Sequence, residues 1–234
     1  MIREISLSDI SDGKTYELND MVKADTGGCA GCHKCCTGMG SSIILDPYDV
    51  WQIKEELNMS FQQLLSEGYI ELNMVDGLIL PNLRMNEKER CSFLNEEGRC
   101  SIHKVRPGIC RIFPLGRVYD GKDFKYFLQK DQCAKESRSK IKVKKWIDTA
   151  NVTENHRFIS QWHYFVRWVG DRNIELKNTG RGECINDIAM YVLNEFFVAD
   201  IYKEEQRAVA DDGLFYMLVI NKIDVARKAI EGLS

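Results

Sequence analysis

Apolar residues recur with a helical period through the last third of the chain. Large apolar side chains stand three and four residues apart in the segments 153–170, 185–202 and 212–230. That spacing puts them on one face of an α-helix and leaves the opposite face polar. The sequence therefore predicts a bundle of three or four amphipathic helices with an ordinary hydrophobic core.

Shorter elements with clear start and turn residues are predicted before this bundle. A short apolar strand at 43–45 precedes Asp46, a favourable N-cap for a helix, and Ser60 is placed to cap a second helix. The Asp-Gly pairs at 76–77 and 120–121 each separate two apolar runs, which is typical of a tight β-hairpin turn. We therefore expect two helices and two β-hairpins in this part of the chain.

These patterns predict a mainly α protein with short β-hairpins, of the α+β class. Residues 1–28 are expected to form a short strand or hairpin, and no internal repeat is evident. The basic stretch KESRSKIKVKKW at 135–146 predicts the solvated face of a helix that joins two halves. We expect a loop-rich, metal-organised N-terminal domain, residues 1–135, packed on a C-terminal helical bundle, residues 136–234.

Composition and charge narrow the classes of partner. The chain of 234 residues is 44% hydrophobic and 29% charged, with a net charge of -3, which is ordinary for a globular protein. This balance gives no reason to expect a nucleic-acid or an anionic-membrane surface. No apolar run approaches the roughly 20 residues of a membrane span, and the N-terminal stretch lacks the apolar segment of a secretory signal. The sequence thus predicts a cytoplasmic protein with no nucleic-acid partner and no membrane partner.

Nine cysteines are many for a chain of this length, and eight of them precede the basic stretch. In a cytoplasmic protein, clustered cysteines more often bind metal or carry out redox chemistry than form stable disulfides. A thiolate is a soft, anionic ligand that suits zinc and iron–sulfur clusters. The predicted metal ligands are Cys29, Cys32, Cys35, Cys36, Cys91, Cys100, Cys110 and Cys133.

The first four of these thiols lie close together in the stretch CAGCHKCC. The C-x-x-C spacing occurs twice, between Cys29, Cys32 and Cys35, and it lets two sulfurs reach one metal centre. Cys36 is adjacent to Cys35, and adjacent side chains of an extended chain diverge. One of this pair is therefore a spare thiol, or the two serve different centres. His33 lies inside the stretch, where a place beside the ligands is favoured over a role as a ligand.

The remaining four thiols have long, irregular spacings that match no zinc-finger or ferredoxin motif, so different loops must supply them. Cys110 is predicted just inside a short helix started by Pro107, and a helix N-terminus favours a thiolate. A centre with four thiolates carries a charge of roughly -2, which neighbouring arginines can offset. Arg106 and Arg111 are the predicted cofactor-binding residues, with Arg111 expected nearest the centre. The alternative is that these arginines make ordinary surface salt bridges.

Two cysteine motifs together resemble a known family. The C-x2-C-x2-C-C run at 29–36 is the signature of a cysteine-cluster family described as zinc- or iron-chelating, and the segments CSFL, GRCSI and RPGICRIFP resemble its second block. The resemblance covers residues 25–135 and carries over all eight cysteines. It implies a [4Fe-4S] cluster, with zinc as the alternative. It also implies a link to flagellin lysine methylation, because enzymes described for that reaction contain a similar domain.

Three functions therefore stay open at the level of sequence. An iron–sulfur protein that serves electron transfer or a lysine methylation-like modification would meet a redox partner or a protein substrate. A zinc-binding structural module that binds a partner without catalysis is the alternative, and an interaction protein with free or disulfide-bonded cysteines is the third. No Ser-His-Asp or paired-carboxylate pattern stands out, so the sequence makes no prediction of enzymatic activity.

Overall fold

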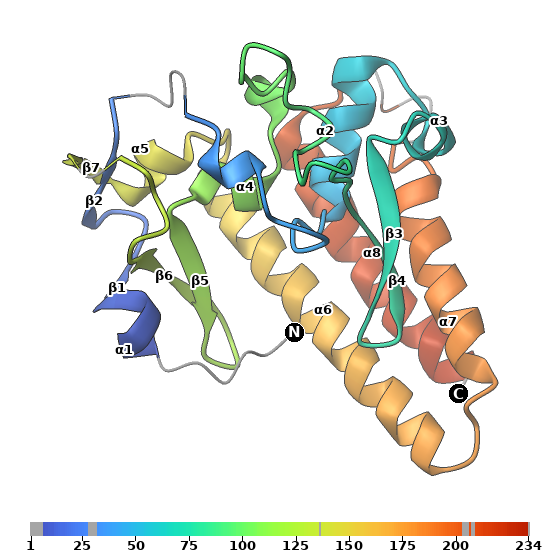
Figure 1. The fold of residues 1–234 in the computed structure, drawn as a ribbon. Helices are drawn as coiled ribbons and strands as arrows, with labels where there is room; N and C mark the ends of the chain where they lie inside the picture. Colours follow the sequence, from blue (N-terminus) through green and yellow to red (C-terminus); the bar gives the residue numbers. More distant parts are fainter. Residues whose placement is uncertain (1–6, 28–31, 136, 203–205, 207–208, 234) are drawn as a thin grey trace.

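The computed structural model describes residues 7–27, 32–135, 137–202, 206 and 209–233. Two small sheets, formed by strands within residues 11–25 and 115–142, lie on one side of the molecule and the long helices lie on the other, with the hairpin of residues 70–83 packed against the helices (Figure 1). The helical side is formed by the three C-terminal helices, which are α6 (Val152–Asn178), α7 (Cys184–Leu193) and α8 (Asp212–Leu233). The predicted bundle is therefore present, and the fold is of the predicted α+β class.

The other helices of the described residues are short and are spread over both sides of the molecule (Figure 1). They are α1 (Leu7–Ile10), α2 (Pro47–Leu57), α3 (Phe61–Ser66), α4 (Gly108–Ile112) and α5 (Val143–Ile147). Short 3₁₀ turns occur at η1 (Lys34–Cys36) and η2 (His103–Val105), and a π turn, η3 (Asn194–Val198), extends α7. Both predicted caps are confirmed, because the side chains of Asp46 and Ser60 each accept a hydrogen bond from the third residue of their helix.

The described residues contain three antiparallel sheets. A three-stranded sheet has the order β1 (Ser11–Tyr16), β6 (Phe124–Gln129), β5 (Leu115–Tyr119), and the other pairs are β2 (Met21–Asp25) with β7 (Ser139–Lys142) and β3 (Ile70–Val75) with β4 (Leu78–Leu83). The N-terminal strands β1 and β2 thus pair with β6 and β7 and not with each other. Sequence pattern identifies such strands but not their distant partners.

Both predicted β-hairpins are confirmed. Asp76 and Gly77 have φ angles of 51° and 77° at the turn between β3 and β4. Two positive φ values in a two-residue loop match the twist of the flanking strands. Gly121 has a φ of 101° in the turn between β5 and β6. The expected strand at 43–45 is instead a single β-bridge, in which Ile44 pairs with Asn82 of β4.

The basic stretch 135–146 is not one helix face, so that prediction was wrong. It forms β7 and α5, with Val143 and Ile147 buried while Lys140 and Lys142 are exposed. Lysines alternate with apolar residues here, which favours a strand once β2 supplies a pairing edge. The division at residue 135 stays a prediction, and the elements after it pack on β2 and α4.

Aromatic side chains make up much of the core of the helical bundle. Phe158 and Phe165 on α6, Phe196 on η3, and Phe215 and Tyr216 on α8 are all at most 1% exposed. Their packing joins α6, α7 and α8 to α2, so the helical side has a continuous apolar interior. No helix in the described ranges is both long and apolar enough to cross a membrane.

Candidate metal centre

Six thiols line a single cavity of about 480 Å³ beside α4. Three separate stretches of chain supply them: the turn around η1, the loop that follows β4, and α4 itself. Most of the other lining side chains are apolar, including Ile43, Leu83, Phe93 and Ile102. The thiols are Cys32, Cys35, Cys36, Cys91, Cys100 and Cys110.

Two copies of one turn present Cys91 and Cys100 to this cavity. The sequences NEKERC, residues 86–91, and NEEGRC, residues 95–100, share the pattern N-E-x-x-R-C. In each copy the asparagine N–H donates to the arginine carbonyl, at 2.8 and 2.9 Å, and the arginine N–H donates to the asparagine Oδ1, at 3.1 and 2.8 Å. The cysteine after the arginine then forms a β-bridge to the residue before the asparagine. Equivalent turns therefore place two equivalent thiols.

The fourth position of each turn needs a left-handed backbone. Gly98 has a φ of 72° and Glu89 a φ of 54°, so only one copy uses the residue best suited to that conformation. The statement that the chain has no internal repeat was wrong at this six-residue scale. The shared N-E-x-x-R-C letters were the signal that could have revealed it.

Cys35 and Cys36 lie on the η1 turn, with their Sγ atoms 3.9 Å apart. The carbonyl of Cys36 accepts a hydrogen bond of 2.9 Å from the Cys91 N–H, which fixes this turn against the first N-E-x-x-R-C turn. A hydrogen bond from Cys36, helped by the charge of Arg106, lowers the pKa of Cys35 to about 7. The same hydrogen bond and burial raise the pKa of Cys36. Cys35 is thus the member of this pair that ionises first.

The thiols of the other segments are held in a less polar setting. Burial raises the pKa of Cys91, Cys100 and Cys110, and the negative charges of neighbouring thiolates raise it further. Five thiols are close enough to affect one another in this way. Several buried thiolates cannot coexist without a cation, so ionisation of this set requires a positively charged centre among them.

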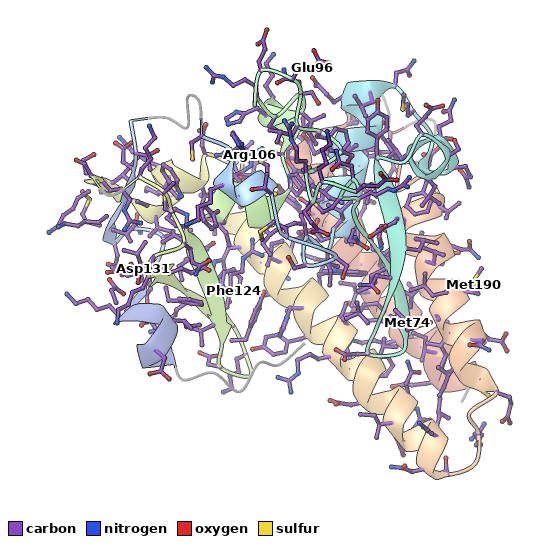
Figure 2. All side chains as sticks on the ribbon, in the orientation of Figure 1. Met74, Glu96, Arg106, Phe124, Asp131 and Met190 are labelled. Carbon is purple, nitrogen blue, oxygen red and sulfur yellow. The ribbon has the colours of Figure 1, made fainter. Side chains whose placement is uncertain are left out.

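Arg106 faces the thiols, whereas Arg111 does not line the cavity. The positive charge of Arg106 favours the ionised forms of Cys35 and Cys100. Its Nη1 lies 3.3 Å from His103 Nε2, and its buried Nε has no hydrogen-bond partner among the described residues. In the view of Figure 2, Arg106 lies below the loop that carries Glu96 and above the sheet that carries Phe124.

Arg111 instead binds backbone carbonyls. Its Nη2 donates to the Lys104 carbonyl at 2.7 Å and its Nη1 donates to the Asp148 carbonyl at 3.1 Å. These bonds fasten α4 to η2 and to the end of α5. The sequence predicted that Arg111 would lie nearest the centre. In the structure Arg106 lines the thiol cavity and Arg111 does not.

Two predicted metal ligands are not among the described lining residues. Cys29 lies outside the described residues, and Cys133 lies in the loop between β6 and β7 and is not part of the described lining. His33 packs on Gly98, where an added Cβ would meet its Nδ1 at 3.2 Å. His103, by contrast, lines the cavity beside Arg106. His103 was not singled out from the sequence, because a lone histidine carries no pattern that marks a site.

The donor set fits a soft metal centre, because thiolate sulfur is the ligand that zinc and iron–sulfur clusters use. The six thiols line one open space of about 480 Å³. Within the described ranges, no three histidine, cysteine, aspartate or glutamate side chains already gather around one point.

The fold and this cavity define a thiol-rich metal-binding protein of the α+β class. The model of the CxxCxxCC family, described as "Putative zinc- or iron-chelating domain", matches residues 28–150, and the chain belongs to that family. The match extends past residue 135 to include β7 and α5. No solved structure matches the chain.

Proposed function

We propose that the chain is an iron–sulfur protein whose cavity holds one [4Fe-4S] centre, used for electron transfer to a redox partner or within a protein-modification reaction. One observation carries the proposal: six thiols from three segments line one largely apolar cavity of about 480 Å³. Such a cluster, when bound, supplies one-electron transfer at a potential set by hydrogen bonds, net charge and solvent exposure. Thiolate is the ligand that this cluster uses.

The chain's own residues would hold and shield the centre. Cys91 and Cys100 would be supplied by the two equivalent turns, whose hydrogen bonds fix their place when the centre is bound. Phe93, which is 2% exposed, and Ile102, which is 1% exposed, keep water from that wall. Arg106 would compensate the thiolate charge at the cavity wall, and its buried Nε–H, which has no partner among the described residues, would donate to sulfur. A nearby positive charge also favours the more negative, reduced state of a bound centre.

Zinc is the second candidate, and one distance favours it. The sulfurs of Cys35 and Cys36 are 3.9 Å apart, while two thiolates on a tetrahedral zinc ion with bonds of about 2.3 Å are separated by about 3.8 Å. This pair could therefore bind one zinc ion. Within the described residues, no third histidine, cysteine, aspartate or glutamate is placed to join them around that ion. Zinc would stabilise the turns without redox chemistry, and the protein would then be a structural module.

Purification without oxygen distinguishes the two candidates. The iron–sulfur proposal predicts a brown protein with broad visible absorption, about four irons and four sulfides per chain, and an EPR signal in one redox state. Cys100→Ser should reduce iron and sulfide content, whereas Cys184→Ser, on the first turn of α7, should not. Stoichiometric zinc with no iron or sulfide in oxygen-free material would refute the iron–sulfur centre and support the structural module.

A further inference from the structure

The carboxylate of Asp49 joins two helices, and one of them carries Cys110. Its Oδ2 accepts the N–H of Asp46 at 3.2 Å, and its Oδ1 accepts the N–H of Gly108 at 2.8 Å. The first bond belongs to the capping box of α2, while the second reaches the first residue of α4, far along the chain. Asp49 is only 5% exposed, so both bonds lie away from water.

Helix α4 has little else to hold its first turn. It is five residues long, and its N-cap, Pro107, makes no side-chain cap hydrogen bond. A helix this short does not persist on its own. The Gly108 N–H is one of the donors that a helix start leaves unsatisfied, and a buried unsatisfied donor is costly. Asp49 therefore supplies the cap that the local sequence lacks.

We propose that Asp49 is a positioning residue for Cys110, and the inference rests on the proposed function. Cys110 follows Gly108 by two residues on a helix that makes less than two turns, so a shift of the helix start moves the thiol. Arg111 fastens the other side of α4 through the carbonyls of Lys104 and Asp148. With Asp49 on one side and Arg111 on the other, the helix cannot rotate, and Cys110 stays directed into the cavity.

The surroundings of Asp49 act on its charge in opposite directions. Burial raises the pKa of Asp49, whereas the hydrogen bonds from Gly108 and Asp46 and the charges of Arg117 and Arg111 favour its ionised form. A carboxyl group has an oxygen that accepts the Gly108 N–H in either protonation state, so the geometry of this bond carries the role. No comparable carboxylate cap is found among the described residues for Cys91 or Cys100, whose turns are closed by Asn95 and its counterpart Asn86.

Alkylation of individual thiols tests the proposal. Asp49→Ala removes the cap of α4 and half of the capping box of α2, whereas Asp46→Ala disrupts the same box and leaves the Asp49–Gly108 bond. Wild type and both variants are loaded with iron and sulfide without oxygen, treated with iodoacetamide, and analysed by peptide mass spectrometry. Loss of such supporting contacts typically weakens metal sites by about 10-fold to 100-fold. We expect Cys110 to react at least about 10-fold faster in Asp49→Ala, with Cys91 unchanged and Asp46→Ala close to wild type.

Equal reactivity of Cys110 in the two alanine variants would overturn the proposal, as would a parallel rise for Cys91. If Asp49→Ala does not fold, Asp49→Asn replaces it, because one amide oxygen must then serve two backbone donors. The same comparison in zinc-loaded protein separates this inference from the proposed function. Failure to bind iron and sulfide refutes the cluster, but in the zinc-loaded protein the Asp49–Gly108 bond still predicts faster alkylation of Cys110 in Asp49→Ala.

Discussion

The thiol cavity and the C-terminal helices are stabilised in different ways. The helices bury a continuous set of aromatic and aliphatic side chains, and removing these from water stabilises them without further help. The cavity walls are short turns joined by a few backbone hydrogen bonds, and their thiols face an open space. We therefore expect the helices to stay folded without the inorganic centre, whereas the cavity turns depend on it to become rigid.

Removal of the metal should separate the two regions most strongly. A chelator that strips loaded protein is expected to make the loop from residue 83 to residue 113 sensitive to protease, because metal binding and folding are coupled in such sites. The three C-terminal helices should resist cleavage, and far-ultraviolet circular dichroism should change little. Mass analysis of the first fragments locates the cuts. Early cleavage within α6 or α8 would show that the helices depend on the centre as well.

A core substitution should produce the opposite result. Phe165 is fully buried on α6, with its ring 5.3 Å from Phe196 and 5.6 Å from Trp162. Phe165→Ala is expected to lower the free energy of unfolding by about 3–5 kcal/mol, while folded protein keeps its metal content. Met190→Ala, on an α7 position that is 46% exposed, is the matched control and should change little. Denaturant titration with metal analysis measures both quantities, and a parallel loss of metal would contradict the separation.

The paired turns allow a smaller test within the cavity region. Gly98→Ala places a Cβ at a left-handed position, 3.2 Å from His33 Nδ1. We expect a loss of about 1–2 kcal/mol and faster release of metal to a chelator. Glu89→Gly, at the same position of the other turn, should be neutral or slightly stabilising, because glycine relieves the left-handed strain there. If Gly98→Ala and Glu89→Gly changed stability and metal release to the same extent, the left-handed position would not have the same role in the two turns.

The smallest expected effect is a pH dependence on the helical side. His163 stacks on Tyr119 with ring centroids 3.4 Å apart, and burial lowers the pKa of His163 from 6.5 to about 4. Between pH 6.5 and about pH 4, His163 is therefore protonated in the unfolded chain and neutral in the folded protein. His163 does not lower the free energy of unfolding above pH 6.5, and it lowers that free energy progressively as the pH drops toward 4.

His163→Phe checks this assignment, since it keeps the stacked ring and removes the titrating group. Denaturant midpoints measured from pH 6.5 down to about 4 should fall less steeply for the variant than for wild type. Metal content should be the same in both proteins over the range where the thiols stay bound. Identical slopes would mean that His163 does not contribute to the acid sensitivity of the fold.

Local signals made much of the fold predictable. Asp46 and Ser60 cap their helices, and the Asp-Gly pair at 76–77 forms its hairpin, because each depends on neighbours within a few residues. The basic stretch at 135–146 was assigned wrongly because its strand exists only beside β2. A strand without its partner has no hydrogen bonds to satisfy its backbone, so pattern alone could not identify it.

The sequence by itself determined the helices, the hairpins and the supply of soft ligands, since periodicity, caps and residue chemistry are local properties. Only the tertiary structure decided which thiols share a cavity, that Arg106 and not Arg111 faces them, and that Asp49 caps the helix of Cys110. Spacing along a chain does not determine distances between loops. Those distances depend on contacts such as the bond from Cys91 to Cys36, which form when distant segments pack together.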